Sequence, residues 1–563
     1  MKKHCLLLLL GVLFVPSLTL AQDVDGEVVE GEELFAEVVD VNVVNVEVYV
    51  TDKKGNPITG LTQDDFQLEV DRQPVAITNF FAVEGGSART AEGVELMPEP
   101  VDPRLPQEQQ PVVPEDQRLH LVIYVDNFNI HPFTRNRVLR NLRSFLRTRL
   151  SRGDRLMLVT YDRSLNIRHP FTSDPDIIAT ALFELEELSG HAIHFDSERR
   201  DILRAVEEAE DIYQVRGRVS QYSESIYSDM RFTLDAAQDL VETLAGLPGR
   251  KAILYVSDGL SMRAGEDVFY AMNDKFPTES SILLDAQRYD LTRRFQSLTG
   301  MANANRVTFY TLEAAGLRTY SYMDASNATI GGGARTDQVH FSNLQSSIRF
   351  MADETGGMAM TNTNDYTKML NRMGDDFDNY YSLGFSPAAS ESGRYKRVRV
   401  RVTNQKKRKL EVRHRDGYRE KPISTRMADS TLAALHYGYQ KDDLPIRLEL
   451  GDQIRQDSGH YLVSLLVKIP LGQLSYLPQE EMHRGRVRLF VGAKDEEGGL
   501  APVADVPVPI DIPAAELEAA KGQYFQYEMK LIMRTGRQVV AVGIRDEIGS
   551  TSGFITRGMR IGA

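Results

Sequence analysis

Between Leu119 and Pro387 the chain alternates short apolar runs with longer helical stretches, and this alternation strongly limits its possible folds. The apolar runs predict strands at residues 119–125, 155–161, 165–171, 252–257, 306–312 and 380–385. Helical spacing predicts one helix whose buried face carries Ile202, Val206, Ala209 and Tyr213. This order of elements predicts an α/β domain at residues 118–388, with a doubly wound, mostly parallel sheet and helices on both faces.

The segments on either side of this domain have the alternating pattern of β-strands. Residues 28–84 carry alternating β-branched positions, and residues 394–419 alternate around a polar turn that predicts a hairpin. Because a two-stranded hairpin is marginal alone, we expect it to complete a β-sandwich with residues 28–84. The α/β domain is then inserted between β-sandwich segments, with a proline-rich linker at residues 85–117.

Residues 444–563 again read as β-structure. Seven alternating segments separated by turns predict an immunoglobulin-like C-terminal β-sandwich.

The first residues have the features of a secretory signal peptide. Lys2 and Lys3 precede a short apolar core that ends in small residues near Ala21, so residues 1–21 are predicted to be removed. Cys5 is the one cysteine of the sequence, and the mature chain would therefore hold no disulfide or thiolate site. We expect a bacterial protein that is periplasmic or secreted. No later run is apolar and long enough to predict a transmembrane segment.

Charge argues against one class of partner. The net charge of −14 is unfavourable for general nucleic-acid binding, which needs a basic surface. Residues 394–421 are an exception, with 13 Lys and Arg against three acids. They are interpreted as a solvated strand face or as a contact for an acidic partner, including the chain's own acidic leader.

Several ordered motifs carry a resemblance to a known family. The stretches "IYVDN", "GDRLMLVTYDRSLNIRHPFTSD" and "PGRKAILYVSDGL" resemble a von Willebrand factor type A domain. The flanking β segments are similar to secreted, type A-related proteins of Acidobacteria. The resemblance implies a Rossmann-like domain that binds other proteins, often through a metal-ion-dependent adhesion site.

In that family the site uses an Asp-x-Ser-x-Ser motif, a loop threonine and a later aspartate. Asp126 and Asp258 match the two aspartates, which the resemblance implies as metal ligands. Phe128 and Ile130 replace the two serines, so the site is degenerate. Two carboxylates with waters could still hold Mg²⁺ or Mn²⁺ weakly. Alternatively, Asp126 caps the following helix and Asp258 accepts hydrogen bonds from loop amides.

Three further polar residues belong to the same predicted binding loops. Asn127 and Asn129 lie one position away from the serine positions, and Thr233 is the candidate loop threonine. A shifted alignment puts Arg231 in that position instead.

Other clusters are weaker candidates. His191, His194 and Asp196 could form a small metal site or lie on the surface. Residues 331–335 lack the context of a phosphate loop, and residues 495–499 fit a hairpin turn better than a calcium site. Neither a His-Glu-x-x-His nor a Gly-x-Ser-x-Gly motif occurs, which argues against an enzyme.

The sequence therefore predicts an exported, non-enzymatic, adhesion-type module that binds a protein or cell-envelope component and needs no cofactor. The alternative is a structural or assembly subunit of the envelope whose β domains make the contacts.

Overall fold

A computed structural model describes residues 43–90, 118–149, 154–190, 192–318, 333–387, 393–403, 410–456 and 459–562. The predicted signal peptide and most of the predicted linker lie outside these residues. The described residues form two compact units, 43–420 and 421–562. Within them, no helix is both long and apolar enough to cross a membrane.

The centre of the first unit is a six-stranded sheet with the order β11-β10-β9-β6-β7-β8. By position in the chain this is the doubly wound order 3-2-1-4-5-6. All neighbours are parallel except β8, which runs antiparallel to β7 at the edge. The strands are β6 (Leu119–Asp126), β7 (Arg155–Tyr161), β8 (Leu165–Thr172), β9 (Arg250–Ser257), β10 (Val307–Glu313) and β11 (Ala359–Met360).

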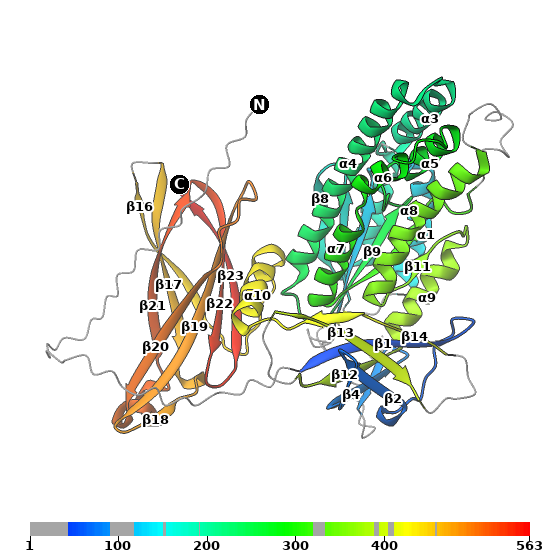
Figure 1. The fold of residues 1–563 in the computed structure, drawn as a ribbon. Helices are drawn as coiled ribbons and strands as arrows, with labels where there is room; N and C mark the ends of the chain where they lie inside the picture. The colour runs from blue at the N-terminus through cyan, green and yellow to red at the C-terminus, as the bar shows by residue number, and fades with distance from the viewer. Residues whose placement is uncertain are drawn as a thin grey trace. The chain divides into compact units, whose positions relative to one another are not determined.

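Helices cover both faces of this sheet (Figure 1). On one face α1, α2 and α9 pack against the strands in a common apolar core. On the other face α4, α7 and α8 form a contiguous layer. Helices α3, α5 and α6 pack with part of α4 in a separate apolar cluster. The helices are α1 (Pro132–Arg149), α2 (Pro175–Glu184), α3 (Ala192–Glu208), α4 (Arg216–Leu244), α5 (Glu266–Lys275), α6 (Ile282–Ala286), α7 (Thr292–Ala304), α8 (Gly333–Thr355) and α9 (Tyr366–Asp378).

Two antiparallel sheets complete the first unit and share one apolar core. Their orders are β14-β1-β12-β4-β5 and β15-β13-β2-β3. Both sheets combine strands from before and after the α/β part, so the α/β part is an insertion between β5 and β12. The strands are β1 (Val44–Asp52), β2 (Phe66–Val70), β3 (Gln73–Val75), β4 (Asn79–Glu84), β5 (Ser87–Thr90), β12 (Tyr380–Phe385), β13 (Tyr395–Val402), β14 (Leu410–His414) and β15 (Gly417–Arg419).

Several details of the sequence prediction were wrong. The run at residues 380–385 is β12, which pairs antiparallel with β1 and β4 and lies outside the parallel sheet. The hairpin predicted at residues 394–419 is not formed by β13 and β14, because β14 pairs with β1, whereas β13 pairs antiparallel with β2 and β15 in the other sheet. The predicted linker begins with a strand, since β5 pairs with β4. An apolar or alternating run predicts a strand but does not identify its neighbours.

Tyr213 was also misplaced. It was predicted on the buried face of a helix, but its side chain is 84% exposed. Helix α3 ends at Glu208. The Asp211 side chain then caps a short 3₁₀ turn by accepting hydrogen bonds from the backbone N–H groups of Tyr213 and Gln214. The helical register therefore stops before this residue, whereas Ile202, Val206 and Ala209 are buried as expected.

The second unit contains two sheets around a common apolar core, with the orders β16-β17-β21 and β20-β19-β22-β23. Strand β18 pairs with the start of β19, and α10 packs on the outer side of β19 and β22. All seven predicted strands are present, while the immunoglobulin-like assignment stays a prediction. The elements are α10 (Ile423–Tyr437), β16 (Arg447–Arg455), β17 (His460–Pro470), β18 (Leu477–Gln479), β19 (Met482–Asp495), β20 (Ala504–Pro513), α11 (Leu517–Ala520), β21 (Tyr524–Arg534), β22 (Gly536–Asp546) and β23 (Ser552–Ile561).

Candidate functional site

The candidate site lies where the strand order of the parallel sheet reverses, between β6 and β9. In doubly wound sheets, ligands bind outside the carboxyl ends of the strands at this point. Asp126 is the last residue of β6, and Asp258 follows the last residue of β9. Both side chains are buried, so each carboxylate needs hydrogen-bond donors from the protein.

Asp126 obtains its donors from its own loop and from β9. The backbone N–H of Asn129 donates to Oδ1 at 3.1 Å, and the side-chain amide of Asn129 donates to both oxygens at 3.1 and 2.9 Å. The hydroxyl of Tyr255 donates to Oδ2 at 2.5 Å. Burial raises the pKa of Asp126 to about 6, although these hydrogen bonds oppose the rise. The carboxylate is thus enclosed by protein donors.

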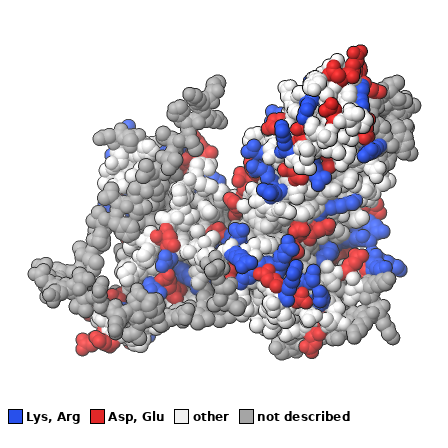
Figure 2. Space-filling model, in the orientation of Figure 1, with Lys and Arg blue, Asp and Glu red and all other residues white. Residues whose placement is uncertain are grey.

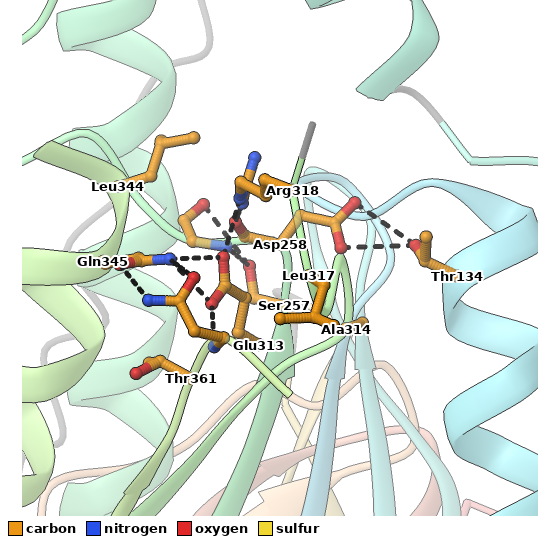
Figure 3. A network of polar contacts seen from close by, with 12 residues as sticks. Thr134, Ser257, Asp258, Glu313, Ala314, Leu317, Arg318, Leu344, Gln345 and Thr361 are labelled. Carbon is orange, nitrogen blue, oxygen red and sulfur yellow. Dashed lines mark hydrogen bonds and ion pairs between the residues drawn. The ribbon is translucent and has the colours of Figure 1, made fainter. Parts of the chain in front are cut away.

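Asp258 is held by the start of the segment that leads into α1. The backbone N–H of His131 donates to Oδ2 at 2.8 Å, and the imidazole Nδ1 lies 2.7 Å from the same oxygen. The hydroxyl of Thr134 lies 3.2 Å from Oδ1 (Figure 3). The imidazole Nε2 is 2.9 Å from Asp196 at the start of α3. Hydrogen bonds to Asp196 and to Asp258 raise the pKa of His131 to about 10, so the ring is cationic at neutral pH.

A third buried carboxylate extends the network to β10 and α8. Glu313 accepts hydrogen bonds from Arg318 Nε at 2.7 Å and from Gln345 at 3.1 and 3.0 Å. Arg318 also donates to the backbone carbonyl oxygen of Asp258. Figure 3 shows Arg318 reaching from its loop to both groups. The loops after β6, β9 and β10 are therefore joined by charged hydrogen bonds.

Gly259 allows the loop after β9 to approach α8 closely. Its φ of 111° lies in the region that favours glycine. A Cβ at this position would lie 2.8 Å from both the Cβ and the carbonyl oxygen of Leu344. This glycine therefore permits the backbone path that places Asp258 beside His131.

The other predicted loop residues are buried in the same region. Asn127 accepts a hydrogen bond from the Arg135 guanidinium and donates to the Ser189 carbonyl oxygen at 2.8 Å, which fixes the loop to the segment before α3. Thr233 lies on α4, where its hydroxyl donates to the Asp229 carbonyl oxygen at 3.0 Å and accepts from the Asn129 amide at 3.3 Å. The structure thus brings Thr233 to Asp126 through Asn129.

Phe128 and Ile130, which the sequence resemblance aligns with two serines, are core residues. Both are almost completely buried. The Phe128 ring packs edge to face with Tyr161 and Phe195, at centroid distances of 6.1 and 5.1 Å. The apolar replacements therefore stabilise the loop by packing.

These residues do not fit a divalent cation in the observed arrangement. Mg²⁺ needs oxygen ligands, but an amide N–H₂ group and a phenol donate to Asp126, and a cationic imidazole contacts Asp258. Among the described residues, no group of three His, Cys, Asp or Glu side chains could hold a metal ion.

Sequence reasoning missed the surface around these loops. Three large apolar side chains there are exposed: Phe133 by 80%, Ile193 by 58% and Leu317 by 62%. Each lies one to three residues from a member of the network, His131, Asp196 or Arg318. A sequence signal was available only for Leu317, which lies in the loop just after β10, where loops face solvent. We call these three residues the apolar rim.

The weaker candidates have local structural partners. His194 pairs with Glu198 at 3.1 Å, and His191 lies outside the described residues. Of the glycine-rich segment at 331–335, Arg335 pairs with Asp274 at 3.2 Å. Residues 495–499 form a turn in which Asp495 accepts the N–H of Gly499 at 2.6 Å.

The basic segment at residues 394–421 is interleaved with acids over β13 (Figure 2). Arg401 pairs with Glu69 at 3.3 Å, and Lys396 pairs with Glu420 at 3.7 Å. Its described part therefore resembles a mixed-charge strand face more than a purely basic patch.

Comparisons with known proteins add little beyond this geometry. No family model matches the chain, and no curated protein matches it. Solved structures that it resembles include an aerotolerance-related membrane protein from Bacteroides fragilis, at 10% identity over 46% of this chain and 98% of that one, with a TM-score of 0.24. A von Willebrand factor type A protein from Catenulispora acidiphila aligns at 10% identity over 88% of this chain and 72% of that one, with a TM-score of 0.22.

The type V pili tip protein Mfa5 from Porphyromonas gingivalis aligns through its three N-terminal domains. The identity is 11% over 71% of this chain and 75% of that structure, and the TM-score is 0.24. Similarity this low shows no function for this chain.

Proposed function

We propose that this chain is an exported, non-enzymatic protein-binding module of the von Willebrand factor type A class. Its binding face is the carboxyl edge of the parallel sheet, and its partner is a protein or a protein component of the cell envelope. The motifs quoted from the sequence and the doubly wound strand order with an antiparallel third strand support this assignment.

The observation that carries the proposal is the apolar rim at the switch point. Phe133, Ile193 and Leu317 are exposed. The segments that carry them are held by hydrogen bonds to the buried carboxylates of Asp258 and Glu313 and to the half-exposed carboxylate of Asp196. In this proposal the three exposed apolar side chains become buried against the partner, since a few buried side chains supply most of the affinity of a protein interface. A polar border is present in His131 and Asp196, which are partly exposed.

Binding at this face is proposed to be independent of metal. In an adhesion site of the usual kind, the cation links the domain to a carboxylate of the partner. Here the protein's own donors occupy Asp126 and Asp258, so apolar contact and hydrogen bonding are left to supply the affinity. The same enclosure, together with the lack of a nucleophile–base pair in the sequence, supports a role without catalysis.

The experiment is affinity capture from the native cell envelope, followed by identification and purification of the captured protein. The purified partner is then titrated against wild-type chain and against Phe133→Ser, Ile193→Ser and Leu317→Ser. Tyr213→Ser is the matched control, because Tyr213 is also highly exposed and follows the opposite end of α3 from Ile193. Equal affinity of the control and the rim variants would refute this binding face.

A second candidate function is an assembly subunit of the envelope whose β domains make the contacts. The specific observation in its favour is the open edge of β21 in the second unit.

A further inference from the structure

The second unit has a sheet edge without a proline or a register shift. Strand β21 (Tyr524–Arg534) is the last strand of the order β16-β17-β21. It pairs with β17 over eleven consecutive residues without a bulge, and among the described residues no strand pairs with its other side. An unpaired row of backbone N–H and C=O groups is a template for a further strand.

The other three edges of this unit each carry a feature that hinders pairing. Strand β20 contains prolines at positions 507, 509 and 513, which remove backbone donors. Strand β16 has a register shift between Leu450 and Gln453. Strand β23 is bridged at Phe554 by Lys441, and its Arg557 donates to the Leu448 carbonyl oxygen of β16. Strand β21 contains no proline and pairs with β17 without a register shift, so the features that hinder pairing at β20 and β16 are absent from it.

The side chains of β21 alternate between two environments. Phe525, Tyr527 and Met529 face the core between the sheets but remain half-buried, whereas Leu531 and Met533 are buried. The intervening residues are exposed on the outer face: Tyr524, Gln526, Glu528, Lys530, Ile532 and Arg534. A strand added at this edge would cover the half-buried apolar groups, which favours an occupant with the same alternation.

We propose that the occupant is a second copy of this chain, with β21 pairing antiparallel to β21 of the copy about a two-fold axis at Met529. In this register Glu528 lies opposite Lys530 of the copy, and Lys530 lies opposite its Glu528. On the inner face Met529 meets Met529, Tyr527 meets Leu531, and Phe525 meets Met533. Both charged pairs are opposite in sign and all inner pairs are apolar, so the strand is complementary to itself.

Lysine on an edge strand normally discourages pairing. In this arrangement it does the reverse, because each Lys530 faces a carboxylate. The product is a six-stranded sheet that crosses the two copies, built by strand addition. This pairing concerns the second unit and does not depend on the binding face of the first.

Charge reversal tests the proposal on the full chain by sedimentation velocity over a wide concentration range. Wild type is expected to show a reversible dimer. Lys530→Glu puts Glu opposite Glu twice and should raise the dimer dissociation constant about tenfold or more. Lys54→Glu is the matched control, because it makes the same charge change at an exposed turn of the other unit and should have no effect.

Two combinations then restore the complementarity. The double variant Glu528→Lys/Lys530→Glu should dimerise like wild type. A mixture of Lys530→Glu with Glu528→Lys should form a heterodimer. The affinity of this heterodimer should exceed that of the homodimer of either variant. A monomeric wild type at every concentration, or a dimer that Lys530→Glu leaves unchanged, would overturn the proposal.

Cross-linking tests the register separately. In a Cys5→Ser background, which removes the one native cysteine, Met529→Cys should form an intermolecular disulfide because residue 529 faces itself. Lys530→Cys should cross-link less, because residue 530 lies opposite residue 528 of the copy and is therefore farther from residue 530 of the copy. Faster cross-linking of Lys530→Cys would exclude the axis at Met529.

Discussion

The imidazole of His131 lies between two carboxylates, with Nδ1 2.7 Å from Asp258 and Nε2 2.9 Å from Asp196. Hydrogen bonds to the two carboxylates therefore hold this cation at the carboxyl edge of the parallel sheet. It connects the loops after β6 and β9 to the start of α3, and thereby supports the surface that carries the apolar rim.

The charge of His131 predicts a pH dependence of stability. Its pKa is raised from 6.5 to about 10, so the folded state holds a proton that the unfolded state loses above pH 6.5. The stabilisation is fully present below pH 6.5 and declines as pH rises from there toward 10. The difference in unfolding free energy between wild type and His131→Asn should therefore shrink across that interval in urea titrations. An imidazole NMR titration near pH 6.5 in the folded protein would contradict this assignment.

The hydrogen bond from the Tyr255 hydroxyl to Asp126 is predicted to stabilise the folded protein. Tyr255→Phe removes a donor from a fully buried carboxylate, and should lower the unfolding free energy by about 1–3 kcal/mol at neutral pH. Tyr124→Phe is the matched control, because Tyr124 stacks on Tyr255 and its buried hydroxyl has no hydrogen-bond partner in the part of the chain that the structure describes. In urea unfolding, Tyr124→Phe should leave the unfolding free energy unchanged or raise it slightly. Equal losses of unfolding free energy in the two variants would contradict the role of the Tyr255 hydroxyl.

Gly259 is predicted to be intolerant of a side chain. Gly259→Ala should destabilise the fold, because its Cβ would meet Leu344 and its φ is unfavourable for alanine. Gly60→Ala separates the two effects, since Gly60 also has a positive φ but no atom lies within 4 Å of the added Cβ. Thermal unfolding should show the larger loss at position 259. The reverse order would mean that the approach to α8 is not close.

Restoring the serines of the family motif is predicted not to create a cation site by itself. Phe128→Ser with Ile130→Ser removes two buried side chains and should cost about 3 kcal/mol or more in stability. Asn129, Tyr255 and His131 would still occupy the carboxylates. Calorimetry with Mg²⁺ and Mn²⁺ should therefore detect no gain over wild type, and a clear gain would show that these donors yield to a metal.

Much of the α/β sheet could be predicted from the sequence, because its strands are apolar runs separated by helical periodicity. Strand β11 was missed, since two residues carry no periodic signal. The strand-end rule located Asp126 and Asp258 correctly at one edge of the sheet.

The partners of the site residues could not be predicted from the sequence. Asn129 was predicted as a binding-loop residue, but its contact with Asp126 was not predicted. That contact depends on a turn of the loop backbone that brings the N–H of Asn129 to the Asp126 carboxylate. His131 meets Asp196 only because α3 starts beside α1, a long-range relationship. The exposure of Phe133 was hidden for a similar reason, because an apolar residue at the start of an amphipathic helix resembles a core residue.

A titration of the identified partner against wild-type chain and Phe133→Ser, each with and without EDTA, distinguishes a metal-free apolar binding face from a site that needs a cation. We expect EDTA to leave wild-type affinity unchanged, Phe133→Ser to weaken binding about tenfold or more, and Tyr213→Ser to have no effect. Loss of wild-type binding in EDTA, or full affinity of Phe133→Ser, would contradict a metal-free apolar binding face at the switch point.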